Sequence, residues 1–284
     1  MKQQEWLLLK LINSYKKQTQ CHSYPETSGA ENLVYMKKII VIALIIFSNG
    51  LLAQVDSLFA KANKLYQNEK YSEALIAYQE IEKHNIDSDD LFYNMANTYY
   101  RMNKIAPAIY YYEKVLLQSP SHSDAQFNLA FAKRMTIDNI EPLPKTLFQK
   151  FNQSFILNFT YNTWAWLAVG LAFLFAVLFL LFHFSYSSTH KRLYFITSFI
   201  SALLALMTIL ITYQNYKYTA FNKEAIVFTQ KTEVKTAPTM ASEVSFELHE
   251  GTKVKILESL DNWKKIKIAD GKIGWMIGDD LKEL

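Results

Sequence analysis

Cysteine is almost absent from this chain of 284 residues, which contains only Cys21. A single cysteine cannot form a disulfide within the chain, so an internal disulfide framework is excluded. Neither sign of charge dominates the chain: the formal net charge is +4, and lysines and glutamates are scattered without a long run of either sign. Because nucleic-acid binding depends on a concentrated basic surface, the sequence argues against a nucleic-acid partner.

Sequences typical of catalytic sites are also missing. The six histidines occur singly, without a partner at metal-ligand spacing, and no HExxH, CxxC or GxSxG motif is present. We therefore predict no catalytic residue, no bound metal and no cofactor, and we expect that the protein is not an enzyme.

Two long apolar runs, Trp164–Phe182 and Leu193–Tyr213, contain no Asp, Glu, Lys or Arg. Either run is long enough to cross a hydrocarbon core about 30 Å thick, since an α-helix rises about 1.5 Å per residue. They predict a hairpin of two membrane spans, at 163–184 and 193–214, joined by a loop at 185–192. The lipid bilayer is therefore a predicted partner. Because the spans carry no charged side chain, transport by this chain alone is not expected.

Residues 36–53 have the order of a secretory signal peptide: a basic start, the apolar core Ile39–Phe47 and small residues near the end. We expect cleavage between Ala53 and Gln54. Because signal peptides begin a chain, residues 1–35 are interpreted as a non-native or unstructured N-terminal extension. The alternative is that Ile39–Leu52 forms an uncleaved anchor within a genuine leader.

Two observations predict the orientation of the hairpin. An exported N-terminal region places the hairpin loop in the cytoplasm, and Lys191 and Arg192 in that loop agree with the positive-inside bias. A hairpin returns the chain to the side that it left, so the regions before and after it share one compartment. We predict a bacterial inner-membrane protein with two spans, whose two soluble regions both lie in the periplasm.

Residues 54–138 repeat with a period of 34. The aligned positions hold the same residue types at Ala62, Ala96 and Ala130, at Ala74 and Ala108, and at Tyr78 and Tyr112. Self-similarity at this period is typical of a helical solenoid, in which small residues lie where two helices touch. The series resembles the tetratricopeptide repeat (TPR). The resemblance implies an all-α array of two and a half repeats, in which the third repeat ends after one helix.

The TPR pattern also implies a set of partner-contacting residues, because the first helix of each pair lines the concave side of such arrays. By position these residues are Phe59, Asn63, Tyr66, Tyr93, Asn97, Tyr100, Phe127 and Phe131. The groove is aromatic and largely uncharged, which suits a peptide or helix from another protein. The alternative is that these rings pack between neighbouring repeats.

Residues 139–162 link the array to the first span. Prolines at 142 and 144 interrupt the helices, and phenylalanines then recur every three or four residues at Phe148, Phe151, Phe155 and Phe159. This spacing predicts an amphipathic helix at the membrane interface. The alternative is a helix that caps the array.

Residues 223–284 change to short alternating stretches, which predict a small barrel. The expected strands are Ala225–Thr229, Glu243–Leu248, Lys253–Leu257, Lys264–Ile268 and Ile273–Ile277. The segments Phe246–Val254, Trp263–Ile266 and Asp270–Trp275 resemble a bacterial SH3-like (SH3b) domain, which is an all-β fold.

The SH3b resemblance implies binding of cell-wall peptides or protein segments. Trp263 matches the ligand-side aromatic of that family, with packing as an equal alternative, and Trp275 is expected to be half-buried. We interpret Gly251, Gly271 and Gly274 as turn residues with positive φ rather than as a phosphate-binding loop.

Together these regions predict a multidomain membrane protein, and their order resembles the BatE proteins of Bacteroides aerotolerance operons. The resemblance implies a non-catalytic scaffold in an inner-membrane assembly for aerotolerance or envelope stress, whose other members carry von Willebrand A and TPR domains. The alternative is a peptidoglycan-binding anchor or sensor that acts through the SH3b domain. A cell-wall hydrolase is disfavoured because the exported part has no cysteine nucleophile.

Overall fold

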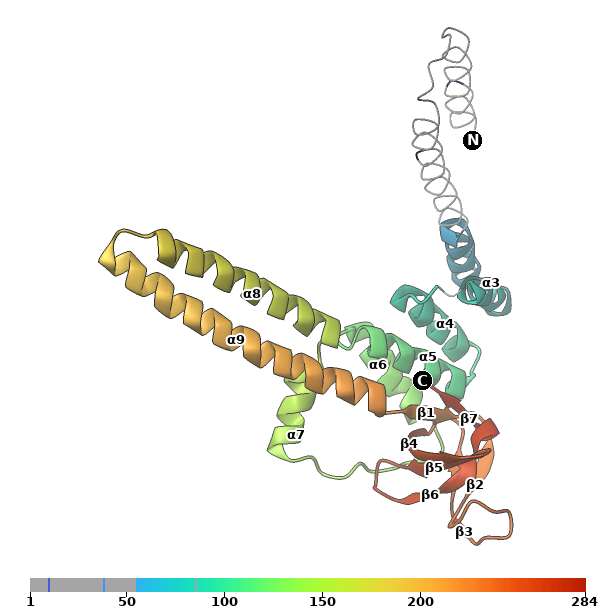
Figure 1. Cartoon of the computed structure of the whole chain (residues 1–284). Helices are drawn as coiled ribbons and strands as arrows, with labels where there is room; N and C mark the ends of the chain where they lie inside the picture. The colour runs from blue at the N-terminus through green and yellow to red at the C-terminus, as the bar shows by residue number, and fades with distance from the viewer. Residues whose placement is uncertain (1–9, 11–37, 39–54, 85) are drawn as a thin grey trace, which may run out of the picture. The chain divides into compact units, whose positions relative to one another are not determined.

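The structure is a computed structural model that describes residues 10, 38, 55–84 and 86–284. The chain divides into two compact units, Met1–Ser57 and Leu58–Leu284. All elements labelled below belong to the second unit (Figure 1). The predictions for 1–35 and 36–53, including cleavage between Ala53 and Gln54, lie outside the described residues except at Lys10 and Lys38.

The second unit begins with a series of short helices. Residues 58–67 are helical, and they are followed by α3 (Tyr71–Lys83), α4 (Asp89–Arg101), α5 (Ile105–Gln118) and α6 (Ser123–Arg134). Two tight turns inside this series are equivalent, because Glu69 has a φ of 60° and Asn103 a φ of 56°. The two turns also share a hydrogen bond: the backbone N–H of Lys70 donates to the carbonyl oxygen of Leu65, and that of Lys104 donates to the carbonyl oxygen of Tyr99. The local geometry thus repeats at the spacing seen in the sequence.

The aligned alanines show where helices touch. Those in the two complete pairs are fully buried, at Ala62, Ala74, Ala96 and Ala108. A methyl group at these positions lets two backbones approach closely. Ala130 of α6 is exposed instead, because no further helix of the array follows α6. The assignment of the array to the TPR family stays a prediction.

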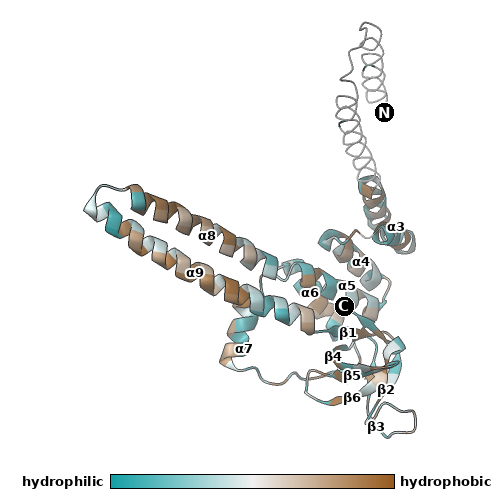
Figure 2. Ribbon diagram, in the orientation of Figure 1, coloured by the Kyte–Doolittle hydropathy of each residue, from teal (hydrophilic) through white to brown (hydrophobic). Residues whose placement is uncertain are grey.

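The middle of the unit contains two long apolar helices. It consists of α7 (Leu147–Phe151), a π-helical turn η1 (Asn152–Ile156), α8 (Tyr161–Phe184) and α9 (Ser188–Phe221). Both α8 and α9 are long and apolar enough to cross a membrane, and Figure 2 shows their apolar colouring side by side. The 34 residues of α9 span about 51 Å, which is longer than a hydrocarbon core.

The helical bounds differ from the predicted spans at the ends of α9. This helix starts at Ser188, so Lys191 and Arg192 lie within its first two turns rather than in a loop. It also continues to Phe221, past the end predicted at 214, because polar residues after the apolar run keep the helical hydrogen bonds. Small polar side chains of α9 face α8: Ser201 Oγ donates to the carbonyl oxygen of Leu171 at 2.8 Å.

The C-terminal part is a sheet of seven antiparallel strands, where five were expected. The strands are β1 (Glu224–Val227), β2 (Lys231–Lys235), β3 (Val244–His249), β4 (Lys253–Leu260), β5 (Trp263–Lys267), β6 (Ile273–Ile277) and β7 (Leu281–Glu283), in the order β3-β2-β6-β5-β4-β1-β7. The prediction missed β2 and β7. β2 has only two buried side chains, Thr232 and Val234, and β7 has three residues, so neither carries a strong apolar alternation.

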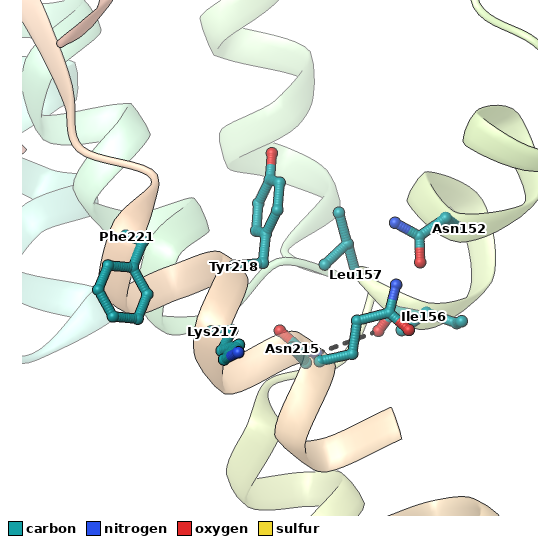
Figure 3. Close-up of a pocket in the computed structure, with 8 residues that line it drawn as sticks. Asn152, Ile156, Leu157, Asn215, Lys217, Tyr218 and Phe221 are labelled. Atoms are coloured by element: carbon teal, nitrogen blue, oxygen red, sulfur yellow. Dashed lines mark hydrogen bonds between the residues drawn. The ribbon is translucent and has the colours of Figure 1, made fainter. Parts of the chain in front are cut away.

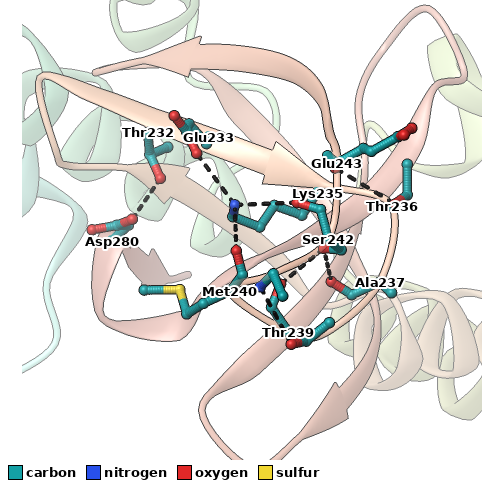
Figure 4. Close-up of polar contacts among 11 residues, drawn as sticks. Thr232, Glu233, Lys235, Thr236, Ala237, Thr239, Met240, Ser242, Glu243 and Asp280 are labelled. Carbon is teal, nitrogen blue, oxygen red and sulfur yellow. Dashed lines mark hydrogen bonds and ion pairs between the residues drawn. The ribbon is translucent and has the colours of Figure 1, made fainter.

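Polar contacts fix the connection between β2 and β3, which Figure 4 shows. Lys235 Nζ donates to the carbonyl oxygen of Met240 at 3.0 Å and lies 3.4 Å from Glu233 Oε2. Thr232 Oγ1 donates to Asp280 Oδ2 at 2.5 Å, which joins β2 to the short helix η2 (Gly278–Asp280) before β7. The loop is therefore an ordered part of the barrel.

Glycine plays two different roles in the barrel. Gly251 and Gly271 have positive φ, of 87° and 96°, as expected for turn residues. Gly274 does not: it lies inside β6, where an added Cβ would stand 2.5 Å from Val234 Cγ1 and 3.0 Å from the carbonyl oxygen of Lys235. The expectation of positive φ at Gly274 is therefore wrong, and the close approach of β2 explains the glycine.

We predict that Gly274→Ala destabilises the protein by about 2 kcal/mol, because the added methyl group meets the buried Val234 side chain and the carbonyl oxygen of Lys235 in β2. Gly170→Ala is the matched control: nothing lies within 4 Å of its Cβ position, and alanine favours helix. Urea unfolding of the full chain in detergent, followed by circular dichroism, measures both. Equal stability of the two variants would contradict the explanation.

Candidate partner-binding surfaces

The helical array is held together by a hydrogen-bond motif that recurs at the 34-residue period. Tyr78 Oη donates to Asn63 Oδ1 at 2.6 Å, and Asn94 Nδ2 donates to the same oxygen at 3.2 Å. The same two contacts recur among Tyr112, Asn97 and Asn128, at 2.5 and 3.0 Å. The two asparagines of the predicted groove are therefore engaged with neighbouring helices.

Four aromatic residues of the predicted groove are half-buried. Phe59 and Tyr93 occupy equivalent places, and each ring packs against a tyrosine of the following helix, at centroid distances of 5.9 and 6.1 Å. Tyr66 packs edge-on against Tyr71 at 5.4 Å, and Tyr100 is half-buried. These rings contribute to packing while part of their surface stays accessible.

Phe127 and Phe131 of α6 are the exposed members of the predicted row. Their side chains are 65% and 40% exposed, and the two rings pack edge-on with centroids 4.8 Å apart. Arg134 lies over the ring of Phe131, with its guanidinium carbon 5.1 Å from the centroid. Phe131 stands where the earlier repeats have the bridging asparagines, so the end of the array presents an apolar pair instead of a polar one.

The outer face of β5 carries the aromatic residue predicted to contact a ligand. Trp263, Lys265 and Lys267 alternate with the buried Ile266, so they share one face of the strand. Lys255 lies directly opposite Lys267 on β4. Within the described part of the chain, neither of these two lysines has a carboxylate within 4 Å. Trp263 is partly exposed, and the face combines an aromatic ring with Lys255 and Lys267, while Lys265 is paired with Glu258 at 3.4 Å.

The other tryptophan of the barrel behaves differently from the expectation. Trp275 is buried rather than half-buried, and Lys265 Nζ lies 5.5 Å from its ring centroid. Strands β5 and β6 place the ring directly opposite Lys265, so the alkyl stem of that lysine can cover it.

A buried ion pair joins α5 of the array to β4 of the barrel. Glu113, whose side chain is only 8% exposed, accepts hydrogen bonds from Lys253 at 2.8 Å and from Lys133 at 2.7 Å. Lys253 also pairs with Glu224 of β1 at 2.6 Å. The aromatic ring of Tyr110 continues the junction, because Lys282 Nζ lies 4.2 Å from its centroid.

Each charge in this cluster depends on the others. Burial alone would raise the pKa of Glu113, but the ammonium groups of Lys253 and Lys133 outweigh it, and the pKa lies below its usual value. Burial alone would lower the pKa of Lys253, but Glu113 and Glu224 raise it above its usual value. Both partners therefore stay charged at neutral pH.

A second polar contact joins the segment after α6 to the turn between β3 and β4. Asp138 accepts hydrogen bonds from the backbone N–H of His249 at 2.7 Å and from Thr252 Oγ1 at 2.6 Å, and its other oxygen lies 2.7 Å from His249 Nδ1. In the same turn, an added Cβ on Gly251 would stand 2.7 Å from Thr136 Cγ2 and 3.1 Å from Ile109 Cδ1. The barrel and the array are therefore in close contact there.

Only a weak signal in the sequence indicates this junction. Residues 109–112 of α5 form a run of large side chains without a polar face, and all four are buried. A helix that is apolar all round is covered on several sides. No local pattern in the sequence indicates the ion pair of Glu113 or the hydrogen bonds of Asp138, because their barrel partners lie 140 and 111 positions further along the chain.

Comparison with known proteins identifies the barrel. Residues 231–282 match the bacterial SH3 domain family, a range that runs from β2 into β7. This match bears out the SH3b resemblance over residues 231–282. No curated protein matches the chain. In the described residues, no group of three or more His, Cys, Asp or Glu side chains is placed to hold a metal ion.

We predict that the contact between the array segment and the barrel weakens in acid. Burial alone would raise the pKa of Asp138, but the hydrogen bonds from Thr252 and His249 lower it below its usual value of 3.8. A lowered folded-state pKa contributes stability that is present above about pH 4 and is lost as the pH falls through the folded value. Asp138→Asn should lower the free energy of unfolding by about 1–2 kcal/mol at pH 7, and the variant should lose less stability than the wild type below about pH 4.

The measurement is urea unfolding of the full chain in neutral detergent between pH 7 and about pH 3. Asp261→Asn, in the turn between β4 and β5, is the matched control because Asp261 is exposed. An Asp138→Asn protein with wild-type stability and wild-type pH dependence would show that this contact does not form.

Proposed function

We propose that this chain, whose C-terminal residues match a bacterial SH3 domain, is a non-catalytic scaffold of the bacterial inner membrane. A bacterial SH3 domain in general indicates binding of peptidoglycan or protein. In the proposed arrangement α8 and α9 cross the membrane as a hairpin, and the helical array and the barrel lie together in the periplasm. Their partners are other membrane or periplasmic proteins, in a Bat-type assembly for aerotolerance or envelope stress.

The observation that carries this proposal is the junction between α5 and the barrel. Glu113 and Lys253 can pair only if the segments before and after the hairpin lie on the same side of the bilayer. Two helices return the chain to the side that it left, so the contact agrees with a hairpin. The TPR assignment of the array, supported by its 34-residue geometry, provides a surface for a protein segment.

The exposed pair on α6 is the part of the array that we propose contacts a partner. Phe127 and Phe131 offer a large apolar surface that is already desolvated on one side by their mutual packing. Aromatic residues of this kind often contribute most of the binding energy of an interface. A hairpin anchor holds this surface near other membrane proteins and so raises their effective concentration.

We predict that a photoreactive phenylalanine analogue at position 127 forms covalent adducts with a specific membrane or periplasmic protein in intact cells. The matched control is the same analogue at Ile76 of α3, which is 67% exposed against 65% for Phe127. Adducts from 127 that disappear when Phe131 is changed to Ala support the surface on α6. Equal adduct patterns from 127 and 76 would contradict it.

A second candidate function is the binding of peptidoglycan through the barrel. The face of β5 favours it, because Trp263 lies in one row with Lys267 and the cross-strand Lys255. Like charges directly opposite each other destabilise a sheet unless an anion compensates them. The carboxylates of peptidoglycan stem peptides have the charge that would compensate Lys255 and Lys267.

For this second function we expect Trp263→Ala and Lys267→Gln each to reduce retention of the detergent-solubilised full chain on purified cell wall by about tenfold. Lys272→Gln is the control, since Lys272 is already paired with Asp270 at 3.2 Å. Wild-type protein that is not retained would exclude this function and leave the scaffold proposal in place.

A further inference from the structure

A pocket of about 360 Å³ lies beside the outer end of the two apolar helices. Its wall consists of the π-helical turn η1 on one side and the last turns of α9 on the other, as Figure 3 shows. Asn152, Ile156 and Leu157 come from η1 and the residue after it, and Gln214 and Lys217 come from α9. In the proposed topology this pocket lies at the level of the lipid headgroups.

Specific hydrogen bonds build the pocket. The buried Asn215 of α9 donates through Nδ2 to the carbonyl oxygens of Ile156 at 3.3 Å and Phe159 at 2.8 Å. Trp164 Nε1 donates to the same carbonyl of Ile156 at 3.0 Å. The π turn is thus tied to both α8 and α9. π-Helical turns of this kind are frequent at functional sites.

One polar atom of the pocket residues has no partner. Asn152 Oδ1 is buried and accepts no hydrogen bond in the described structure. A buried acceptor without a donor is costly, and such groups are rare in native proteins. An amide oxygen in this position calls for a ligand that brings a hydrogen-bond donor.

Lysines surround the pocket, and the one carboxylate whose charge reaches a described pocket residue, Glu224 near Tyr218, is itself paired with Lys253 at 2.6 Å. The chain has no Asp or Glu between Glu141 and Glu224, yet its outer flanks carry Lys145, Lys150, Lys217 and Lys223. Lys217 lines the pocket, with Nζ 4.9 Å from the ring centroid of Tyr213, and has no carboxylate within 4 Å among the described residues. An ammonium group that has no carboxylate partner and lies next to a bilayer can pair with the phosphate of a lipid headgroup.

We propose that this pocket binds the headgroup of a glycerophospholipid that carries a hydrogen-bond donor beyond its phosphate, such as an ethanolamine or glycerol headgroup. Lys217 attracts the phosphate, and Asn152 Oδ1 accepts the bond from the ammonium or hydroxyl group. A choline headgroup has the phosphate but no such donor, so it can pair with Lys217 but cannot donate a hydrogen bond to Asn152 Oδ1. The inference rests on the proposed membrane hairpin.

The test is native mass spectrometry of the full chain, purified into detergent with an equimolar mixture of phosphatidylethanolamine and phosphatidylcholine that share the same acyl chains. We expect wild-type protein to retain the ethanolamine lipid about tenfold more than the choline lipid. Asn152→Leu should abolish this preference, and Lys217→Gln should reduce retention of both lipids. Lys191→Gln removes the same charge at the opposite end of the hairpin and should change neither value.

Three results would overturn the inference: equal retention of the two lipids by wild-type protein, an unchanged preference in Asn152→Leu, or displacement of the lipid by millimolar glycerol 3-phosphate, which would indicate a site for free phosphate compounds. Extraction of wild-type membranes with alkaline carbonate separates this failure from that of the hairpin. A chain released by carbonate refutes the hairpin, whereas a retained chain without lipid preference refutes only the pocket assignment.

Discussion

The ion pair between Glu113 and Lys253 is the constraint on which the arrangement of this molecule depends. A carboxylate that is almost fully buried is stable only if a cation accompanies it, since the cost of removing a lone charge from water is several kcal/mol. Here the cation comes from a strand that follows two membrane-length helices. In the proposed hairpin, α8 and α9 return the chain to its starting side, so the contact agrees with two spans.

The junction also joins the array to the barrel at more than one place. Asp138 binds the turn between β3 and β4, and α5 contacts the same turn near Gly251. The array and the barrel are thus held by direct contacts as well as by their covalent connection through the hairpin. The proposed partner surface on α6 and the lysine-bearing face of β5 then belong to one docked body.

Patterns that are local in the sequence predicted the structure well. Equivalent turns at Glu69 and Asn103 match the 34-residue spacing, and the apolar runs predicted α8 and α9. The strands with clear alternation were found, whereas the weakly patterned β2 and β7 were not. Gly274 was misread because a glycine in a strand resembles a turn glycine until the neighbouring strand is known.

The remaining features depend on contacts between distant residues, which no local pattern records. Nothing near Glu113 in the sequence indicates that Lys253 will reach it, and nothing near Asn152 indicates that its amide oxygen will be buried without a partner. Similarly, the groove asparagines Asn63 and Asn97 match a ligand-contact pattern in the sequence, while the structure shows them bridging helices. Sequence periodicity locates a surface, but it does not tell which of its side chains are already engaged.

Hydroxyl-radical footprinting of the full chain in lipid nanodiscs tests the docking of the barrel on the array most directly. Tyr110 of α5 is buried next to Phe228 and Lys282 of the barrel, while Tyr186 between the two long helices is fully exposed and serves as the internal reference. The account predicts that Tyr110 is oxidised far more slowly than Tyr186. Oxidation of both tyrosines at similar rates would show that the barrel does not cover α5, and would contradict the arrangement described here.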